Sequence, residues 1–333
     1  MGADGGTAAG ASAHLLDIRG LKTHFATDDG MVQAVDGVDI TIGRGETVGV
    51  VGESGCGKTV TALSVLKLIA MPPGRIVAGQ ILWQGSDLVP LPARKLDRIR
   101  AKEIAVVFQE PMTSLNPVYT VGEQIAEVLR RHEGLSRRAA LARTVEMLKT
   151  VHNPNAERRV RDYPHQFSGG MRQRVMIAMA LACNPKLLIA DEPTTALDVT
   201  IQAQILELLQ ELKGRLGMAI MLITHAMGVV AETAQRVVVM YAGKVVEEAP
   251  VRQLFADPRH PYTRGLIRSI PRIDKAAATR TRLEAIAGVV PSLVRPAPGC
   301  RFAPRCPFAS DVCTRASPPL REVGPDHKVA CVL

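Results

Sequence analysis

The first candidate for chemistry is a glycine-rich stretch, Gly52 to Thr59, that reads Gly-Glu-Ser-Gly-Cys-Gly-Lys-Thr. This is the spacing G-x-x-x-x-G-K-[ST], in which glycines let backbone N–H groups converge on phosphate oxygens at the start of a helix. Lys58 would then lie on the β- and γ-phosphates of a nucleotide, and the Thr59 hydroxyl on Mg²⁺. A glycine turn that binds nothing is the alternative, but the flanking apolar run and helical pattern favour the phosphate site. The predicted nucleotide-binding residues are Gly52, Ser54, Gly55, Cys56, Gly57, Lys58, Thr59 and Val60.

A second candidate is a pair of carboxylates that ends the apolar run Leu187 to Ala190. Asp191 would complete the metal shell, and Glu192 would orient and polarise an attacking water. Acidic residues that face solvent at the end of a strand are the alternative. Together with the phosphate loop, the pair predicts a site that hydrolyses a nucleoside triphosphate.

Two further polar residues lie at the ends of apolar runs. Gln109 follows Ile104 to Phe108 and could reach Mg²⁺ or water, while His225 follows Met218 to Ile223 and could contact the γ-phosphate. Taken alone, Gln109 would be an ordinary loop residue and His225 a structural histidine. Their positions at strand ends favour a catalytic interpretation of both.

A serine and two glycines precede a second helical pattern, which runs from Arg172 to Ala182. A helix N-terminus of this kind is an anion site. One nucleotide does not need two such sites, so the second is predicted to serve a nucleotide held by a partner chain. Ser168 also suits the role of a helix N-cap, which does not exclude the first role. The predicted residues of this second site are Ser168, Gly169, Gly170 and Met171.

These candidates need a scaffold in which strands alternate with helices, and the apolar periodicity supplies one. Such alternation implies an α/β fold with a mostly parallel sheet that is covered on both faces. An antiparallel patch precedes it, with His14 to Thr27 as an edge strand, and a helical subdomain interrupts it at about 109–185. Strands are predicted at 47–51, 80–84, 104–108, 186–190, 218–223 and 236–241, and helices at 60–70, 121–131, 136–151, 172–182 and 201–212.

The composition of the 333 residues bounds the class of protein. The length suggests about two domains. The 41 basic and 32 acidic residues leave a net charge of +9, but the basic residues form separate clusters with few aromatics among them, which argues against nucleic acid as a partner. No run of apolar residues is long enough to span a bilayer, so work at a membrane would need another chain. Met1 to Ala13 lacks the features of a signal peptide and is expected to be a disordered lead.

Six motifs occur in the order of an ABC transporter nucleotide-binding domain, and the chain resembles this family over residues 14 to about 270. The resemblance implies a P-loop NTPase (RecA-like) core and a head-to-tail pair of such domains. Each ATP would lie between the phosphate loop of one domain and the Ser-Gly-Gly helix of the other. Asp198 would lie in the loop that crosses the dimer, and Phe25 would stack on adenine, with plain packing as the alternative for Phe25. The motifs are Gly52–Thr59, Gln109, Ser168–Gly170, Asp191–Glu192, Ala196–Asp198 and His225.

Longer matches narrow this resemblance to the ATP-binding subunits of bacterial oligopeptide/dipeptide importers. They comprise Tyr163–Arg174, Thr195–Gln204 and a cysteine-bearing tail. The resemblance implies a second, related ATPase subunit, two membrane-spanning permeases and an extracytoplasmic substrate-binding protein. The permeases' coupling helices would occupy a groove lined by Glu110–Gln124. One departure is Ala226, because the family usually has an acidic residue after the switch histidine.

Residues 271–333 are expected to form a small C-terminal module with little apolar core. Four of the chain's six cysteines lie in it at the spacing C-x5-C-x6-C-x17-C. Disulfides are disfavoured in a cytosolic ATPase, and zinc sites normally contain a shorter C-x2–4-C element. Longer spacings are compatible with a [4Fe-4S] cluster, which some relatives that resemble this pattern carry. Zinc and unligated thiols stay open as alternatives for Cys300, Cys306, Cys313 and Cys331.

The resemblance therefore implies an ATP-hydrolysing subunit that lies peripherally on the cytoplasmic face of the bacterial inner membrane. Closure of two nucleotide domains on ATP, hydrolysis and reopening would drive the permeases to import di- or oligopeptides. Nickel, haem or another small solute is the alternative cargo. A soluble ABC ATPase that acts on nucleic acid is a further alternative, but its usual coiled-coil insertions or fused second domain do not occur here.

Overall fold

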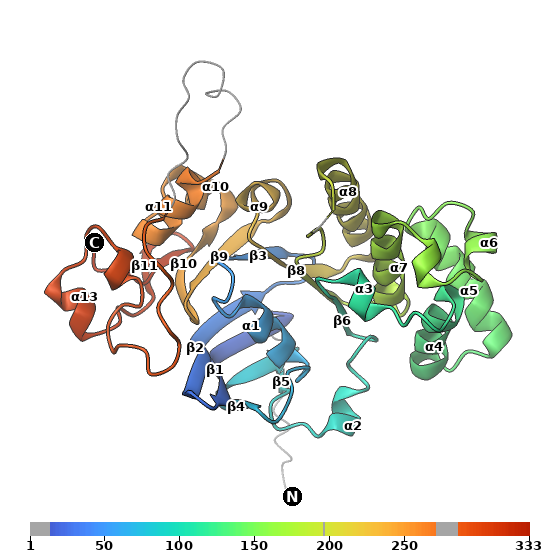
Figure 1. Cartoon of the computed structure of the whole chain (residues 1–333), viewed down its shortest axis with the longest axis horizontal. Coiled ribbons are helices and arrows are strands. Elements are labelled where there is room, and N and C mark those ends of the chain that lie inside the picture. The colour runs from blue at the N-terminus through green and yellow to red at the C-terminus, as the bar shows by residue number, and fades with distance from the viewer. Residues whose placement is uncertain (1–13, 196, 271–285) are drawn as a thin grey trace, which may run out of the picture.

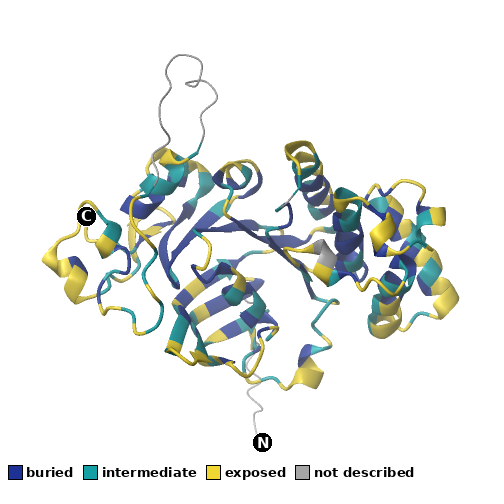
Figure 2. Cartoon of the chain, viewed as in Figure 1, coloured by how far each residue is buried: buried dark blue, intermediate teal, exposed yellow. Residues whose placement is uncertain are grey.

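The computed structural model describes residues 14–195, 197–270 and 286–333, so the predicted lead at 1–13 lies outside the described residues. Two sheets form its centre, with the helical subdomain at one end of the molecule and the C-terminal residues at the other (Figure 1). Buried residues fill the central strands of the second sheet and alternate with exposed ones in the first sheet and on the helices (Figure 2). No helix in the described ranges is long and apolar enough to cross a membrane.

The first sheet is antiparallel and has the order β2-β1-β4-β5. The predicted edge strand is wrong in its placement, because β1 pairs with β2 on one side and β4 on the other: Leu16 lies opposite both Ile42 and Trp83. Alternation of apolar residues reports that one face of a strand is buried, but it does not report how many neighbours the strand has. The strands are β1 (Leu16–Thr27), β2 (Gly30–Ile42), β4 (Gly74–Trp83) and β5 (Ser86–Asp87).

The second sheet has eight strands in the order β11-β12-β10-β9-β3-β8-β7-β6. The strands from β9 to β6 are parallel, as predicted, while β10, β12 and β11 pair antiparallel and make the sheet mixed. Every residue of β3, β7 and β8 is buried, which suits the centre of a sheet covered on both faces. The strands are β3 (Thr47–Val51), β6 (Ile104–Val107), β7 (Leu187–Asp191), β8 (Ala219–Thr224), β9 (Arg236–Tyr241), β10 (Lys244–Pro250), β11 (Arg321–Gly324) and β12 (His327–Val329).

Helix α1 (Lys58–Val65) contacts strands of both sheets and shares their apolar core. The predicted helix to Ala70 is wrong at its end. Lys67 has a positive φ of 50°, and its N–H donates to Ser64 O while the N–H of Leu68 donates to Leu63 O. This is a Schellman ending, which usually contains glycine at the left-handed position. Because lysine occupies that position here, the sequence gives no stop signal.

The helical subdomain follows β6 and lies at the far end from the C-terminus (Figure 1). In α4, Val121, Ile125 and Leu129 are buried at the spacing of one helix face, and Thr120 caps the helix by accepting from Glu123 N. The apolar faces of these helices form one core with β6 and β7. The helices are α3 (Pro111–Ser114), α4 (Val121–Glu133), α5 (Arg137–Thr150), α6 (Ala156–Arg159), the 3-10 helix η1 (Pro164–Gln166) and α7 (Gly169–Leu181).

The C-terminal segment, residues 286–333, adds β11 and β12 to the edge of the second sheet through β10. Its Phe302 joins a core cluster that contains residues of β9 and β10. The segment therefore shares the core of the sheet instead of building one of its own. The remaining helices are α2 (Ala93–Leu96), α8 (Val199–Leu216), α9 (Met227–Thr233), α10 (Val251–Ala256), α11 (Pro261–Arg268), η2 (Ala303–Arg305) and α13 (Asp311–Arg315).

Candidate functional site

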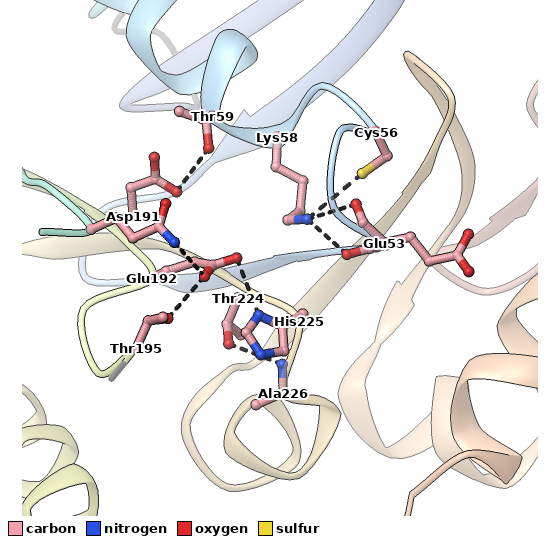
Figure 3. A network of polar contacts seen from close by, with 12 residues as sticks. Glu53, Cys56, Lys58, Thr59, Asp191, Glu192, Thr195, Thr224, His225 and Ala226 are labelled. Carbon is pink, nitrogen blue, oxygen red and sulfur yellow. Dashed lines mark hydrogen bonds and ion pairs between the residues drawn. The ribbon is translucent and has the colours of Figure 1, made fainter. Parts of the chain in front are cut away.

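The carboxyl ends of β3, β6, β7 and β8 meet at one edge of the second sheet, because these strands are parallel and adjacent in space. This is the edge at which open α/β sheets bind ligands. It brings together five elements of the predicted site, several of which are visible in Figure 3. They are the phosphate-binding loop (Gly52–Thr59), Gln109, Asp191, Glu192 and His225.

The phosphate-binding loop joins β3 to the first turn of α1. Gly57 has a positive φ of 98°, and a Cβ added there would lie 2.4 Å from Ala34 O, so only glycine fits. Among the hydrogen bonds of the described residues, none uses the N–H of Gly55 or Gly57. These amides, at the positive end of α1, form a cradle suited to phosphate oxygens.

Lys58 is buried and lies against its own loop. Its Nζ donates to Gly52 O at 2.7 Å and to Glu53 O at 3.0 Å, and it lies 3.8 Å from Cys56 Sγ. Burial raises the pKa of the Cys56 thiol, and the nearby ammonium of Lys58 opposes that rise. Cys56 is therefore a buried, protonated thiol that packs under the loop, and Lys58 supplies the positive charge of the phosphate site.

Thr59 and Asp191 form the candidate Mg²⁺ site. Thr59 Oγ1 donates to Asp191 Oδ1 at 3.1 Å, and Asp191 is only 3% exposed. Burial raises the pKa of Asp191, while the hydrogen bond from Thr59 lowers it. A hydroxyl and a carboxylate are the oxygen donors that Mg²⁺ takes in nucleotide sites, where the phosphates complete its shell. The residues present therefore fit the metal.

Glu192 is the centre of a hydrogen-bond network beside this pair (Figure 3). Its Oε2 accepts from Thr195 Oγ1 at 2.8 Å and from Gln109 Nε2 at 3.2 Å, and its Oε1 lies 3.2 Å from His225 Nδ1. Burial would raise the pKa of Glu192, but the contacts with His225 and Thr195 bring it below its ordinary value. The carboxylate is therefore ionised at neutral pH, as a base that polarises water must be.

The backbone at Glu192 is strained, with a φ of 45° in the left-handed region. Non-glycine residues held in this region cost about 1–3 kcal/mol and cluster at functional sites. The N–H of Glu192 donates to Ile223 O at 2.9 Å, which ties the residue to the adjacent strand β8. The fold thus fixes the direction of this carboxylate at an energetic cost.

His225 reaches Glu192 without help from residue 226. The N–H of Ala226 donates to Thr224 Oγ1 at 3.0 Å, and Ala226 is the N-cap residue of α9 without a side-chain cap. An acidic residue there would cap the helix and add a charge beside His225. Alanine in place of the acidic residue that is usual in the family thus leaves α9 without a side-chain cap, while the contact between His225 and Glu192 is present.

The remaining predicted site residues lie apart from this edge. Ser168 is the N-cap of α7 and accepts from Met171 N at 3.4 Å, and Asp198 is the exposed N-cap of α8 and accepts from Ile201 N at 2.9 Å. In the described residues, no hydrogen bond or ion pair joins Ser168 to the phosphate-binding loop. Ala196, of the predicted Ala196–Asp198 motif, lies outside the described residues.

The glycines of the Ser168 turn pack against the start of α8. A Cβ on Gly170 would lie 2.7 Å from Ile201 Cγ2, so the two helix starts approach too closely for any larger residue. Phe25 lies on β1 with its ring against the Gly74 backbone, where an added Cβ would meet it at 2.9 Å. This contact is a packing contact, and nothing in it reports on adenine.

The cysteines of the C-terminal segment surround one small cavity, together with His260 and Phe302. All are free thiols, and burial raises the pKa of Cys300 and Cys306. In the described part of the chain, no group of three or more His, Cys, Asp or Glu side chains is placed to hold a metal ion. The cysteines that line the cavity are Cys300, Cys306, Cys313 and Cys331.

Sequence reasoning missed three residues that touch the site. Thr195, which donates to Glu192, lies in a stretch where no spacing rule marks it. Glu53 occupies one of the variable positions of the loop motif. Its partner Arg305 lies 252 residues further along the chain, so no local pattern could connect the two.

Two family models match the chain. One is described as "ABC transporter" and matches residues 35–195, and the other as "Oligopeptide/dipeptide transporter, C-terminal region" and matches residues 246–313. The chain is also similar to the dimeric structure of a post-hydrolysis state of an ATP-binding cassette bound to ADP and Pi, with a TM-score of 0.64, 28% identity, and coverage of 71% of this chain and 99% of that one. Fold and site thus define an ATP-binding cassette, which is an ATP-hydrolysing enzyme.

Relatives in sequence extend over nearly the whole chain. The probable peptide ABC transporter ATP-binding protein of Sinorhizobium fredii is 55% identical over 317 residues, which are 95% of this chain and 94% of that protein. The oligopeptide transport ATP-binding protein OppD of Bacillus subtilis is 52% identical over 315 residues, which are 95% of this chain and 87% of that one. The chain belongs to the family of ABC transporter ATP-binding proteins that carry the oligopeptide/dipeptide transporter C-terminal region.

Proposed function

We propose that this chain hydrolyses ATP to drive the import of di- and oligopeptides through membrane-spanning permeases. The observation that carries the proposal is the similarity to proteins named for peptide transport along 95% of this chain, together with the match to the C-terminal region at residues 246–313. The chain would lie peripherally on the cytoplasmic face of the membrane. Its companions would be a second ATPase subunit, two permeases and an extracytoplasmic binding protein.

The catalytic roles follow from the geometry of the edge site. Lys58 and the loop amides bind the triphosphate, and Thr59 and Asp191, with Gln109 at the rim, are the residues that would hold Mg²⁺. Bound Mg²⁺ neutralises charge on the phosphates. Glu192, ionised and fixed by its neighbours, accepts a proton from water and orients that water. His225 lies 3.2 Å from Glu192 and would contact the γ-phosphate.

The second half of each ATP site comes from the partner ATPase in this proposal. Ser168 and Gly169 are exposed at the start of α7, Gly170 and Met171 are half-buried behind them, and Asp198 caps the next helix. Since these residues lie apart from the chain's own phosphate-binding loop, they are free to complete a nucleotide site on a neighbouring subunit. ATP would then hold the two subunits together, and hydrolysis would release them.

The permeases dock, in this proposal, on the helical subdomain. A groove of ≈ 860 Å³ runs along α4. Its lining shares only Tyr119, Glu123 and Gln124 with the predicted range Glu110–Gln124 and continues to Arg137. Tyr119, which lines it, and the adjacent Val118 are 58% and 71% exposed, so that two neighbouring apolar side chains face solvent at the groove. Replacing Tyr119 by alanine should weaken association with the permeases and leave ATP affinity unchanged. Val323→Ala, which trims an exposed apolar side chain of β11 outside both the α4 groove and the cysteine cavity, is the control.

The C-terminal cysteines hold a [4Fe-4S] cluster in this proposal, with Zn²⁺ as the alternative. Its support is the sequence spacing of the four cysteines, all of which line one small cavity. In the described residues their side chains are not placed as a metal-binding group, so they would have to converge when a cluster binds. The cluster would staple residues 271–333 as a module next to the nucleotide domain, residues 14–270. Iron and sulfide analysis of anaerobically purified protein is the test. About four iron and four sulfide per chain are expected, whereas zinc or metal-free protein would contradict the cluster.

The import function is tested with a Glu192→Gln variant in the native organism. Uptake of labelled di- and oligopeptides should be lost, while uptake of nickel and haem should stay at the level of the parent strain. Loss of nickel or haem uptake with normal peptide uptake would overturn the assignment of cargo. Purification from detergent-solubilised membranes should recover hydrophobic permeases with this chain, and recovery of nucleic acid or ribosomes in their place would contradict the proposal.

A further inference from the structure

Arg305 of the C-terminal segment reaches the phosphate-binding loop. Its Nη1 donates to Glu53 Oε2 at 2.7 Å and its Nη2 to Oε1 at 3.1 Å, which is a two-point ion pair. The Arg305 side chain is only 4% exposed, so solvent screens the pair little. The C-terminal segment, although remote in sequence, therefore binds the phosphate-binding loop through the side chain of Glu53.

The guanidinium of Arg305 is itself fixed in one orientation. Its Nε donates to Ala287 O at 2.9 Å, Nη2 to Ile286 O at 3.1 Å and Nη1 to Tyr241 Oη at 3.2 Å. With the two bonds to Glu53, all five N–H donors of the side chain have a partner. Arg305 is therefore a rigid support for Glu53.

The backbone of Glu53 is held as firmly as its side chain. Its N–H donates to Tyr262 Oη at 2.8 Å, and Tyr262 is fully buried against Tyr241 with ring centroids 4.6 Å apart. Its carbonyl oxygen accepts from Lys58 Nζ at 3.0 Å. Figure 3 shows the carboxylate of Glu53 directed away from Glu192, on the opposite side of the loop from the hydrolytic residues.

We propose that Arg305 is a positioning residue for ATP binding, through which the C-terminal segment controls the affinity of the phosphate-binding loop. The ion pair keeps the loop in the one shape that the triphosphate binds, so that binding does not have to order the loop. Because the pair lies away from Glu192, its loss weakens the binding of ATP and of the transition state alike. Such uniform binding changes KM and leaves kcat unchanged.

The test uses the purified full-length chain with ATP and Mg²⁺. Arg305→Ala should raise KM for ATP about tenfold, with kcat within about twofold of the parent value. The KM of Arg305→Lys should lie between those of the parent chain and Arg305→Ala, because an ammonium keeps the charge but cannot make the two-point contact. Calorimetric titration of ATP into each variant, combined with Glu192→Gln to block turnover, should show the same rise in Kd.

A double variant separates this contact from general damage. Glu53→Gln should raise KM by itself, and adding it to Arg305→Ala should raise KM no further, since both changes break one contact. Arg301→Ala is the matched control. Arg301 is an equally buried arginine of the same segment, but it pairs with Asp36 at 2.8 Å and not with the loop. Its removal should leave KM for ATP near the parent value.

Several outcomes would overturn the proposal. One is an unchanged KM in Arg305→Ala, and another is an equal rise of KM in Arg301→Ala. The third is a KM in the double variant Arg305→Ala/Glu53→Gln that rises by the product of the two single-variant effects. If the arginine variants failed to fold, Glu53→Gln alone would decide, because Glu53 is partly exposed and the change conserves its shape. The test needs only ATP. Failure of the peptide-uptake experiment therefore leaves this proposal standing, and failure here leaves the cargo assignment untouched.

Discussion

The side-chain amide of Gln109 donates a hydrogen bond of 3.2 Å to Glu192 Oε2. Gln109 follows β6, where the chain leaves the sheet for the helical subdomain, and Glu192 follows the neighbouring parallel strand β7. One contact thus joins the entrance of the subdomain that carries the α4 groove to the carboxylate proposed to polarise water. A movement of the subdomain would change the surroundings of that carboxylate directly.

Gln109→Ala should weaken the coupling between transport and hydrolysis. The contact is exposed and carries about 1 kcal/mol, so basal ATP turnover should fall less than about fivefold. Stimulation of turnover by substrate-loaded binding protein should fall much further, because the link to the subdomain is lost. The measurement is ATP turnover of the assembled importer in vesicles. Gln84→Ala, which breaks a similar bond to Glu103, is the control and should retain full stimulation. Normal stimulation in Gln109→Ala would contradict this role.

Thr195→Val should change the pH dependence of turnover. The Thr195 hydroxyl donates to Glu192 at 2.8 Å and lowers the pKa of that carboxyl, so its removal should raise the pKa. Glu192 acts as a base only when ionised, and its depressed pKa keeps it ionised to lower pH. The acid limb of the pH–rate profile should therefore move to higher pH. Thr200→Val, at an exposed threonine outside this network, should leave the profile in place. An equal shift of the acid limb in both variants, or no shift in either, would contradict the role of Thr195 in lowering the pKa of Glu192.

His327→Ala should destabilise the sheet edge formed by the C-terminal segment. His327 Nε2 lies 2.7 Å from Glu247 Oε1, and both side chains are essentially buried. Removing His327 leaves one oxygen of a buried carboxyl group without this hydrogen bond, which costs about 1–3 kcal/mol. Two backbone N–H bonds to Glu247 remain, from Arg259 and His260, so a loss of about 2 kcal/mol is expected in the free energy of unfolding.

The control for this prediction is Lys328→Ala on the same strand. Lys328 is half-exposed and pairs with Glu248 at 3.7 Å, a surface contact that is expected to contribute less than about 1 kcal/mol. Chemical denaturation of the two variants should therefore separate them clearly. Equal losses of stability in the two variants would show that the contact of His327 with Glu247 does not hold β12 to the sheet.

The structure brings the residues of the predicted edge site together because each is marked by a local pattern. Gly57 and His225 come after apolar strands and Asp191 ends one, and parallel strands bring such ends together whatever lies between them. The central strands β3 and β9 also occur at their predicted residues. A motif and the strand before it are enough to place a residue at this edge.

What the sequence could not predict depends on contacts between distant residues. The alternation in β1 does not reveal that it has two neighbours, and the lysine at position 67 hides the end of α1. The strands β11 and β12 are short, and β11 has no buried residue, so their sequences carry little strand pattern and they form by pairing with the edge of β10. The ion pair of Glu53 with Arg305 is invisible for the same reason.

Turnover of ATP by the Glu192→Gln variant tests the central claim most directly. Glutamine keeps the size of the side chain and can bond to Thr195, but it cannot accept a proton from water. Calorimetric affinity for ATP with Mg²⁺ should stay within about threefold of the parent chain, and steady-state turnover should fall about 10²- to 10⁴-fold. Turnover near the parent rate, with ATP bound normally, would show that Glu192 does not polarise the attacking water.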